Sequence, residues 1–227
     1  MKDLAPNELI TYAAAKLEEL VEDVVFLGGA VVGLLITDLG ANTPRMTKDV
    51  DVTIEISSLV EYYKLDKRLL AKGFKNDTRG PLCRYLHGQI VIDLMPTAPE
   101  ILGFANRWYP TAISTAQTYR LESGMAINLV TSSCFLATKM EAFISPHREG
   151  HYDILLSRDF EDVIRVIDGR VSIVEDVRSA PSELSGFLSD SFEAVLDEDY
   201  LEEAIAEHVG PGRVNLVTDR MKSLISH

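Results

Sequence analysis

Two aspartates stand two residues apart in the most regular strand pattern of the chain. Between Lys48 and Ile56, acidic or hydroxyl side chains alternate with valine and isoleucine, which is the period of a β-strand with one buried face. The pattern places Asp49 and Asp51 on the same face. Two carboxylates this close repel each other unless a cation lies between them, and their hard oxygens suit Mg²⁺. Such a pair can also belong to a solvated strand face.

A third aspartate, Asp93, lies inside the apolar run from Ile90 to Met95. Burying a carboxylate in such a run is costly unless it has a partner. If this strand lies beside the strand of Asp49 and Asp51, the three carboxylates can share two Mg²⁺ ions. Two metal ions can clamp the attacking and leaving oxygens of a phosphoryl transfer. The alternative is that Asp93 marks the edge of a sheet.

Gly28 and Gly29 follow a short apolar strand, residues 24–27, and precede an expected helix at residues 30–37. Glycine allows a phosphate to approach the backbone closely, and a helix N-terminus offers free N–H groups. The pair is therefore a candidate nucleotide-binding turn, to which Thr47 and Lys48 could add polar contacts. A simple tight turn is the alternative.

Taken in order, these residues resemble the nucleotidyltransferase superfamily with the polymerase-beta-like fold. The resemblance covers about residues 20 to 96, less than half of the chain. It implies an α/β (α+β) fold with a small mixed sheet. It also implies transfer of a nucleoside monophosphate from a nucleoside triphosphate, such as ATP or GTP, to an acceptor hydroxyl. In that reaction Asp49, Asp51 and Asp93 would hold two Mg²⁺ ions, and Asp93 would also activate the acceptor.

The helical half of the chain adds a second resemblance. Residues 136–143 and 157–163 look like the later motif of AbiEii/AbiGii-type toxin nucleotidyltransferases. This resemblance implies that Lys139 contacts nucleotide phosphates and that Asp159 and Asp162 line the cleft. Asp159 would orient the lysine or help to deprotonate the acceptor, and Arg45 matches a nucleotide-binding arginine of the family. It further implies a toxin of a toxin–antitoxin or abortive-infection system, with an antitoxin protein as partner.

The match to this family has gaps, and its residues have simpler readings. The segment at residues 146–151 fits the family only loosely, and the acidic C-terminal region has no counterpart in it. Lys139 could be a surface lysine that extends its ammonium group to solvent. Asp159 could merely favour the helix dipole. His147 and His151 are four residues apart, but in a glycine-containing loop where a metal site is not expected.

A run of basic residues follows the Asp-x-Asp strand between residues 64 and 84. Its members are Lys64, Lys67, Arg68, Lys72, Lys75, Arg79 and Arg84. This run could guide an RNA or tRNA acceptor, or it could be an ordinary solvated helix face.

The overall charge restricts the classes of partner. With 22 basic and 35 acidic residues the net charge is −13, which argues against a protein that coats nucleic acid. Cys83 and Cys134 are far apart and lack zinc-ligand spacing. With no apolar signal segment and no long apolar run, we expect a soluble, cytoplasmic protein and no membrane partner.

The pattern of elements changes near residue 131. Before it, strands are expected at residues 24–27 and 48–56, with hairpins at residues 82–95, turning at His87-Gly88, and at residues 118–130. Helices are expected at residues 7–23, 30–37 and 59–72, and a short helix near 101–107. After it, only helices are expected, at residues 132–144, 158–167, 181–196, 198–208 and 213–226. We therefore expect a catalytic core at residues 1–130 and a helical region at residues 131–227.

Two other functions are compatible with the same residues. The same core could modify a small molecule, as antibiotic nucleotidyltransferases do. The chain could also be an interaction protein that keeps the fold without catalysis, although the presence of all three carboxylates favours an enzyme.

Overall fold

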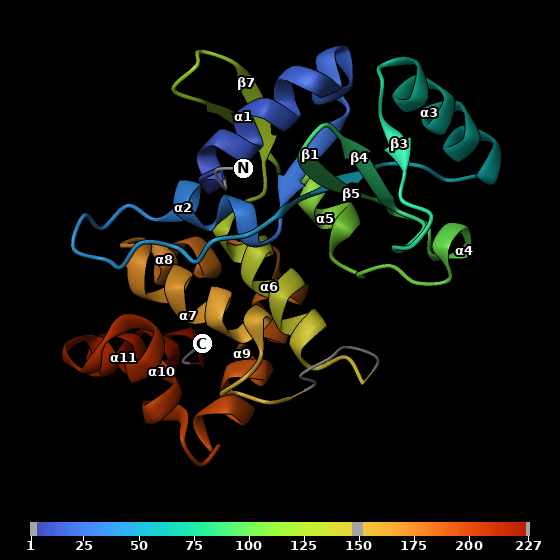
Figure 1. The fold of residues 1–227 in the computed structure, drawn as a ribbon. Coiled ribbons are helices and arrows are strands. Elements are labelled where there is room, and N and C mark those ends of the chain that lie inside the picture. Colours follow the sequence, from blue (N-terminus) through green and yellow to red (C-terminus); the bar gives the residue numbers. More distant parts are fainter. Residues whose placement is uncertain (1–3, 147–151, 226–227) are drawn as a thin grey trace. The chain divides into compact units, whose positions relative to one another are not determined.

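The computed structural model describes residues 4–146 and 152–225 (Figure 1). The chain forms two compact units. The first contains Met1–Val31 and Arg45–Thr131, and the second contains Val32–Pro44 and Ser132–His227. The sequence pattern assigned residues 32–44 to the first domain, whereas their contacts place them in the second unit.

One mixed seven-stranded sheet organises the first unit, in the order β3-β4-β5-β2-β1-β7-β6. The strands are β1 (Val24–Leu27), β2 (Asp49–Ile54), β3 (Lys75–Asn76), β4 (Arg84–His87), β5 (Ile90–Pro96), β6 (Gln117–Arg120) and β7 (Ala126–Leu129). β2 pairs with β5 in parallel and with β1 in antiparallel orientation. The expected α+β fold with a small mixed sheet is confirmed.

Helices and turns of the first unit accompany this sheet. They are α1 (Pro6–Leu17), η1 (Glu18–Glu22), η2 (Gly29–Val31), α3 (Leu59–Ala71), α4 (Pro99–Leu102) and α5 (Tyr109–Ser114). The helix expected at residues 7–23 is interrupted at Glu18, whose φ of 53° is incompatible with a right-handed helix. Instead of one helix near residues 101–107 there are two short ones, and each has a proline in its first turn.

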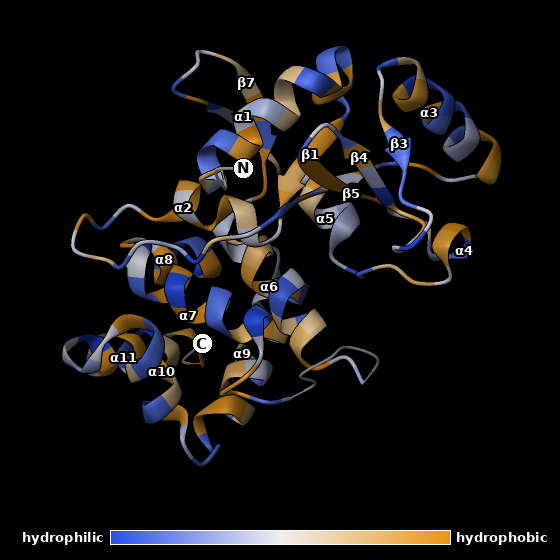
Figure 2. Ribbon diagram, in the orientation of Figure 1, coloured by the Kyte–Doolittle hydropathy of each residue, from blue (hydrophilic) through white to orange (hydrophobic). Residues whose placement is uncertain are grey.

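The apolar face of the sheet follows from strand register. Val50 of β2 lies opposite Ile92 of β5, and Val52 lies between Leu94 of β5 and Phe26 of β1. These five side chains are essentially inaccessible to solvent. Figure 2 shows β1 in the hydrophobic colour along its length. Because side chains alternate along a strand, the residues between them must point to the opposite face.

The described residues of the second unit are helical or irregular. The helices are α2 (Val32–Leu35), α6 (Ser132–Phe143), α7 (Arg158–Gly169), α8 (Ile173–Arg178), α9 (Ser182–Leu196), α10 (Leu201–Val209), η3 (Pro211–Arg213) and α11 (Val214–Ile225). α6 contacts α7, α8 and α9 and is the most buried of them. α8 was not expected from the sequence.

Two expected helices have other bounds than their patterns indicate. α10 begins at Leu201 because Tyr200 adopts a left-handed conformation, with φ of 68°. The helix expected at residues 30–37 is instead the single turn η2 followed by the single turn α2. In residues 4–146 and 152–225, no helix is long and apolar enough to cross a membrane.

Candidate functional site

Three carboxylates lie together on the face of the sheet opposite the apolar ladder. Asp51 of β2 is directly opposite Asp93 of β5, and Asp49 lies two residues before Asp51 on the same face. Asp93 is buried, with 8% of its surface exposed, while Asp49 and Asp51 are half-buried. The condition that the strand of Asp93 lies beside the Asp-x-Asp strand is therefore met, because β5 is a direct parallel neighbour of β2.

Gly28 packs directly against one of these carboxylates. Its predecessor, Leu27, is the register partner of Asp51. Gly28 has φ of 75°, and a Cβ atom built on it would lie 1.8 Å from Oδ2 of Asp51. Both the backbone conformation and the space therefore require glycine here. Gly29 is also buried and begins η2, so the turn leads into a single 3-10 turn and not into the long helix expected.

Arg84 is the residue that sequence reasoning missed at this site. It was placed only in the basic run, but on β4 it is the register partner of Asp93. Its Nε donates to Asp93 Oδ1 at 2.8 Å, and its Nη2 donates to Asp93 Oδ2 at 2.6 Å. The same Nη2 lies 3.5 Å from Oδ2 of Asp49. The hydrogen bond to Asp93 raises the pKa of the Arg84 guanidinium further above its ordinary value.

The hairpin turn explains why this partner was missed. A turn at His87-Gly88 would pair Arg84 with Val91. In the structure His87 pairs with Ile90, so Gly88 and Gln89 form the turn and Arg84 moves opposite Asp93. A shift of one residue in a turn changes every cross-strand pair of the hairpin.

Thr47 orients one carboxylate. Its Oγ1 donates to Asp49 Oδ1 at 2.7 Å, and Thr47 itself is nearly buried. Thr47 therefore contacts a carboxylate of the site, and its contact with a nucleotide stays a prediction. Lys48 is exposed, and Arg45 is half-buried at the beginning of the segment that leads into β2.

The three carboxylates differ in the contacts that they already make. Asp49 and Asp51 present carboxylate oxygens on one face, as Mg²⁺ coordination requires. Both oxygens of Asp93 are already engaged by the guanidinium of Arg84. Within the described parts of the chain, no group of three acidic, histidine or cysteine side chains is arranged to hold a metal ion.

Lys139 belongs to the second unit, where it joins two helices. From α6 its Nζ reaches Asp159 Oδ1 and Asp162 Oδ2 of α7, each at 2.8 Å. Lys139 is 8% exposed and Asp162 is fully buried, so the reading of Lys139 as a surface lysine is wrong. Asp159 also lies in the first turn of α7, so its contact with Lys139 and a favourable position at the helix start coexist. The expected loop with His147 and His151 lies outside the described residues.

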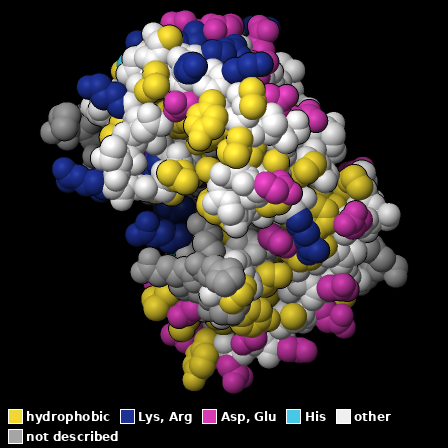
Figure 3. Space-filling model, turned by 90° about the vertical axis from the view of Figure 1, so that its right-hand side faces the viewer, with side chains coloured by type: hydrophobic (Ala, Val, Ile, Leu, Met, Phe, Trp, Pro, Cys, Tyr) yellow, Lys and Arg dark blue, Asp and Glu magenta, His cyan; other side chains and the backbone are white. Residues whose placement is uncertain are grey.

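Several members of the basic run between residues 64 and 84 are neutralised within the protein. Lys72 contacts Glu18 and Glu19 at 2.7 and 2.6 Å, and Arg68 lies 3.4 Å from Asp23. α3 also exposes apolar side chains, namely Leu59, Val60 and Tyr63. The molecular face in Figure 3 accordingly mixes hydrophobic side chains with charged ones of both signs. This composition differs from a continuous basic groove.

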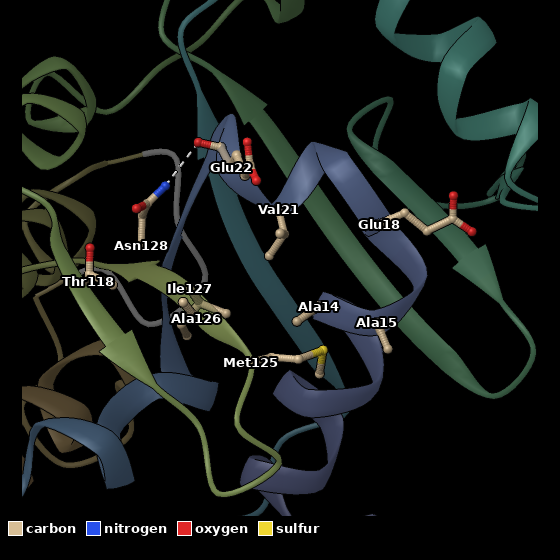
Figure 4. Close-up of a pocket in the computed structure, with 10 residues that line it drawn as sticks. All are labelled: Ala14, Ala15, Glu18, Val21, Glu22, Thr118, Met125, Ala126, Ile127 and Asn128. Carbon is tan, nitrogen blue, oxygen red and sulfur yellow. Dashed lines mark hydrogen bonds between the residues drawn. The ribbon is translucent and has the colours of Figure 1, made fainter.

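A hollow of about 460 Å³ lies elsewhere in the first unit (Figure 4). α1, η1 and the β6–β7 hairpin line it, and Asn128 Nδ2 donates to the carbonyl oxygen of Glu22 at its rim at 3.0 Å. None of its lining residues is a candidate site residue. Its walls carry small apolar side chains such as Ala14 and Ala126, with Glu18 as a charged member.

Comparisons with known proteins add little. No protein-family model matches the chain, and no curated protein matches it. Among solved structures, the crystal structure of JHP933 from Helicobacter pylori is similar, with a TM-score of 0.48 and 12% sequence identity. That similarity covers 97% of this chain and 91% of JHP933.

Proposed function

We propose that this protein is a metal-dependent nucleotidyltransferase that moves a nucleoside monophosphate from a nucleoside triphosphate to an acceptor hydroxyl. The observation that carries the proposal is the carboxylate face of the sheet. Asp49, Asp51 and Asp93 lie on two adjacent strands, and the turn at Gly28 packs against Asp51. The resemblance of these motifs to the nucleotidyltransferase superfamily supports the same reaction.

In this proposal each residue has a defined role. Asp49 and Asp51 hold Mg²⁺, and Thr47 fixes the carboxylate of Asp49 through its hydrogen bond. A bound Mg²⁺ ion supplies positive charge that offsets the charge of the phosphates. The acceptor oxygen forms a bond to the α-phosphorus, the bond between the α-phosphorus and its bridging oxygen breaks, and pyrophosphate leaves. Asp93 lies beside Asp51, and each of its oxygens has a second lone pair besides the one that Arg84 engages, so it is the carboxylate proposed to receive the hydroxyl proton.

The acceptor and the biological role rest on resemblance alone. An RNA or tRNA acceptor, a toxin role and an antitoxin partner are proposals drawn from the AbiEii/AbiGii-like motif, as is a phosphate contact by Lys139. Because basic residues around α3 are paired with acidic side chains, the RNA or tRNA acceptor has less support than the other proposals drawn from this motif.

Label transfer tests the proposal. The full chain is incubated with Mg²⁺, each α-labelled triphosphate and total RNA, with a mixture of small cationic acceptors in a parallel arm. We expect transfer by the wild type and a loss of about a hundredfold or more in Asp49→Asn and Asp51→Asn, since metal charge stabilisation contributes several kcal/mol. Glu55→Gln is the matched control, because Glu55 is exposed just beyond the end of β2 and should retain activity. Transfer that persists in both aspartate variants would exclude this site.

A further inference from the structure

Arg84 is held at the carboxylates by more than one constraint. Strand register places it opposite Asp93, and both of its hydrogen bonds reach the two oxygens of that carboxylate. A Cβ atom built on Gly80 would lie 2.9 Å from Cδ of Arg84, so the absence of a side chain at residue 80 leaves room for the arginine. The guanidinium is therefore positioned by the fold and does not reach the site merely from a flexible surface.

The charges of this cluster indicate what it can bind. The guanidinium of Arg84 offsets the charge of Asp93 and lies 3.5 Å from Oδ2 of Asp49. A second divalent ion at Asp93 would stand beside the guanidinium and be repelled by it. Arginine is suited to this position because its planar fork matches both carboxylate oxygens and stays charged at all physiological pH values.

We propose that the guanidinium of Arg84 takes the place of a second metal ion at this site. It holds Asp93 in place and leaves a single divalent-cation position at Asp49 and Asp51. This inference rests on the proposed function for the identity of the site, and it proposes one Mg²⁺ ion where the resemblance implies two. Arg84 is thus a positioning residue that sets the metal stoichiometry. A purely structural ion pair across β4 and β5 would have no effect on the number of ions bound.

Metal stoichiometry tests this inference without reference to activity. The full chain is titrated with MnCl₂ alone, and bound Mn²⁺ is measured by calorimetry and by electron paramagnetic resonance. The wild type should bind one Mn²⁺, and Arg84→Met should bind two, because Asp93 is released as a ligand. Arg120→Met is the matched control, since Arg120 lies on β6 of the same unit and its side chain donates to the carbonyl oxygen of Gly124. The control should bind one ion.

A second variant decides the matter if Arg84→Met does not fold. Asp93→Asn removes the carboxylate that Arg84 occupies, so it should still bind one Mn²⁺, but more weakly, because the cluster loses a negative charge and keeps the guanidinium. An Asp93→Asn variant that binds no Mn²⁺ at any concentration overturns the inference. Two Mn²⁺ ions in the wild type, or an unchanged single ion in folded Arg84→Met, overturns it as well.

The metal-binding experiment and the transfer experiment test the two proposals separately. If no nucleotidyl transfer occurs but the Mn²⁺ pattern holds, the proposed reaction is wrong and the role of Arg84 stands. If transfer occurs and the wild type binds two ions, the reaction stands and the role of Arg84 is wrong. A wild type that binds no Mn²⁺ contradicts both.

Discussion

Gly28 and Asp51 come from separate segments of the chain, yet the backbone of one fills the space beside the carboxylate of the other. The carboxylate Oδ2 lies where a side chain at residue 28 would begin, and Gly28 also adopts a left-handed conformation. Glycine at this position is thus needed twice, once for conformation and once for space. The two requirements can be separated by experiment.

Gly28→Ala should both destabilise the protein and displace Asp51. A non-glycine residue in the left-handed region costs about 1–2 kcal/mol, and the clash with Asp51 adds to it. We expect a lower urea midpoint and loss of Mn²⁺ binding. Urea denaturation and Mn²⁺ titration measure the two effects.

Gly124→Ala provides the control for the conformational effect. Gly124 has φ of 87°, but a Cβ atom built on it meets nothing within 4 Å. This variant should lose only the stability that the left-handed backbone conformation costs, and it should bind Mn²⁺ like the wild type. If Gly28→Ala also binds Mn²⁺ normally, the position of Asp51 does not matter for the metal site.

At the scale of elements, the buried Lys139 forms ion pairs that link α6 to α7. Asp162 is fully buried, and Lys139 provides a positive charge 2.8 Å from its Oδ2. Removing one member of a buried ion pair takes a partner from a charge in the interior, which costs more than the pair contributes. α6 is the helix around which α7, α8 and α9 pack, so the cost falls on the centre of the unit.

Lys139→Met should lower the free energy of unfolding by about 3 kcal/mol. Circular dichroism during urea denaturation measures this change. Lys222→Met, on the exposed face of α11, is the control and should have little effect. Adding Asp162→Asn to Lys139→Met should recover part of the loss, and equal stability of Lys139→Met and Lys222→Met would refute the explanation.

Features that depend on local periodicity could be predicted from the sequence. Features that depend on the register between strands could not. Alternation in β2 is a local property, so the shared face of Asp49 and Asp51 could be predicted. The partner of Asp93 depends on which two residues form the β4–β5 turn, and the sequence pattern placed that turn one residue too early. The burial of Lys139 depends on helix packing, which no local pattern contains.

At the scale of the whole molecule, each unit carries one buried thiol. Cys83 lies in the first unit and Cys134 in the second. Burial raises the pKa of Cys83 to about 11, and the nearby charge of Asp93 adds to this effect. Burial raises the pKa of Cys134 to about 12. The two thiols therefore report on the integrity of the two units separately.

Native thiols should react slowly with iodoacetamide at pH 8. Because thiolate is the reactive form, pKa increases of about two and three units lower its fraction about a hundredfold and a thousandfold. Cys83 should therefore react faster than Cys134 in the native state, and peptide mass spectrometry measures both rates. Equal native rates, or native rates like those in 8 M urea, would contradict this.

The same thiols link stability to alkaline pH. Unfolded thiols ionise near pH 9, whereas the folded ones hold their protons to higher pH. Their contribution is fully present below pH 9 and is lost as the pH rises towards 12, so the free energy of unfolding should fall over this window. Urea denaturation at pH 8 and pH 10.5 measures this decrease, and Cys-to-Ala variants of both residues should reduce it.

The segment Val32–Pro44 restricts the order in which parts of the chain can fold. It lies between two parts of the first unit, but Thr37 and Asp38 donate backbone hydrogen bonds to Gly169, and Asp38 accepts from Arg213 Nη2 at 2.6 Å. Residues more than a hundred positions apart must therefore meet before the helical unit is complete. During synthesis from the N-terminus, this early segment can complete its contacts only after Arg213 has emerged. A fragment cut at residue 132 would lack it altogether, so the helical unit cannot be obtained intact by truncation.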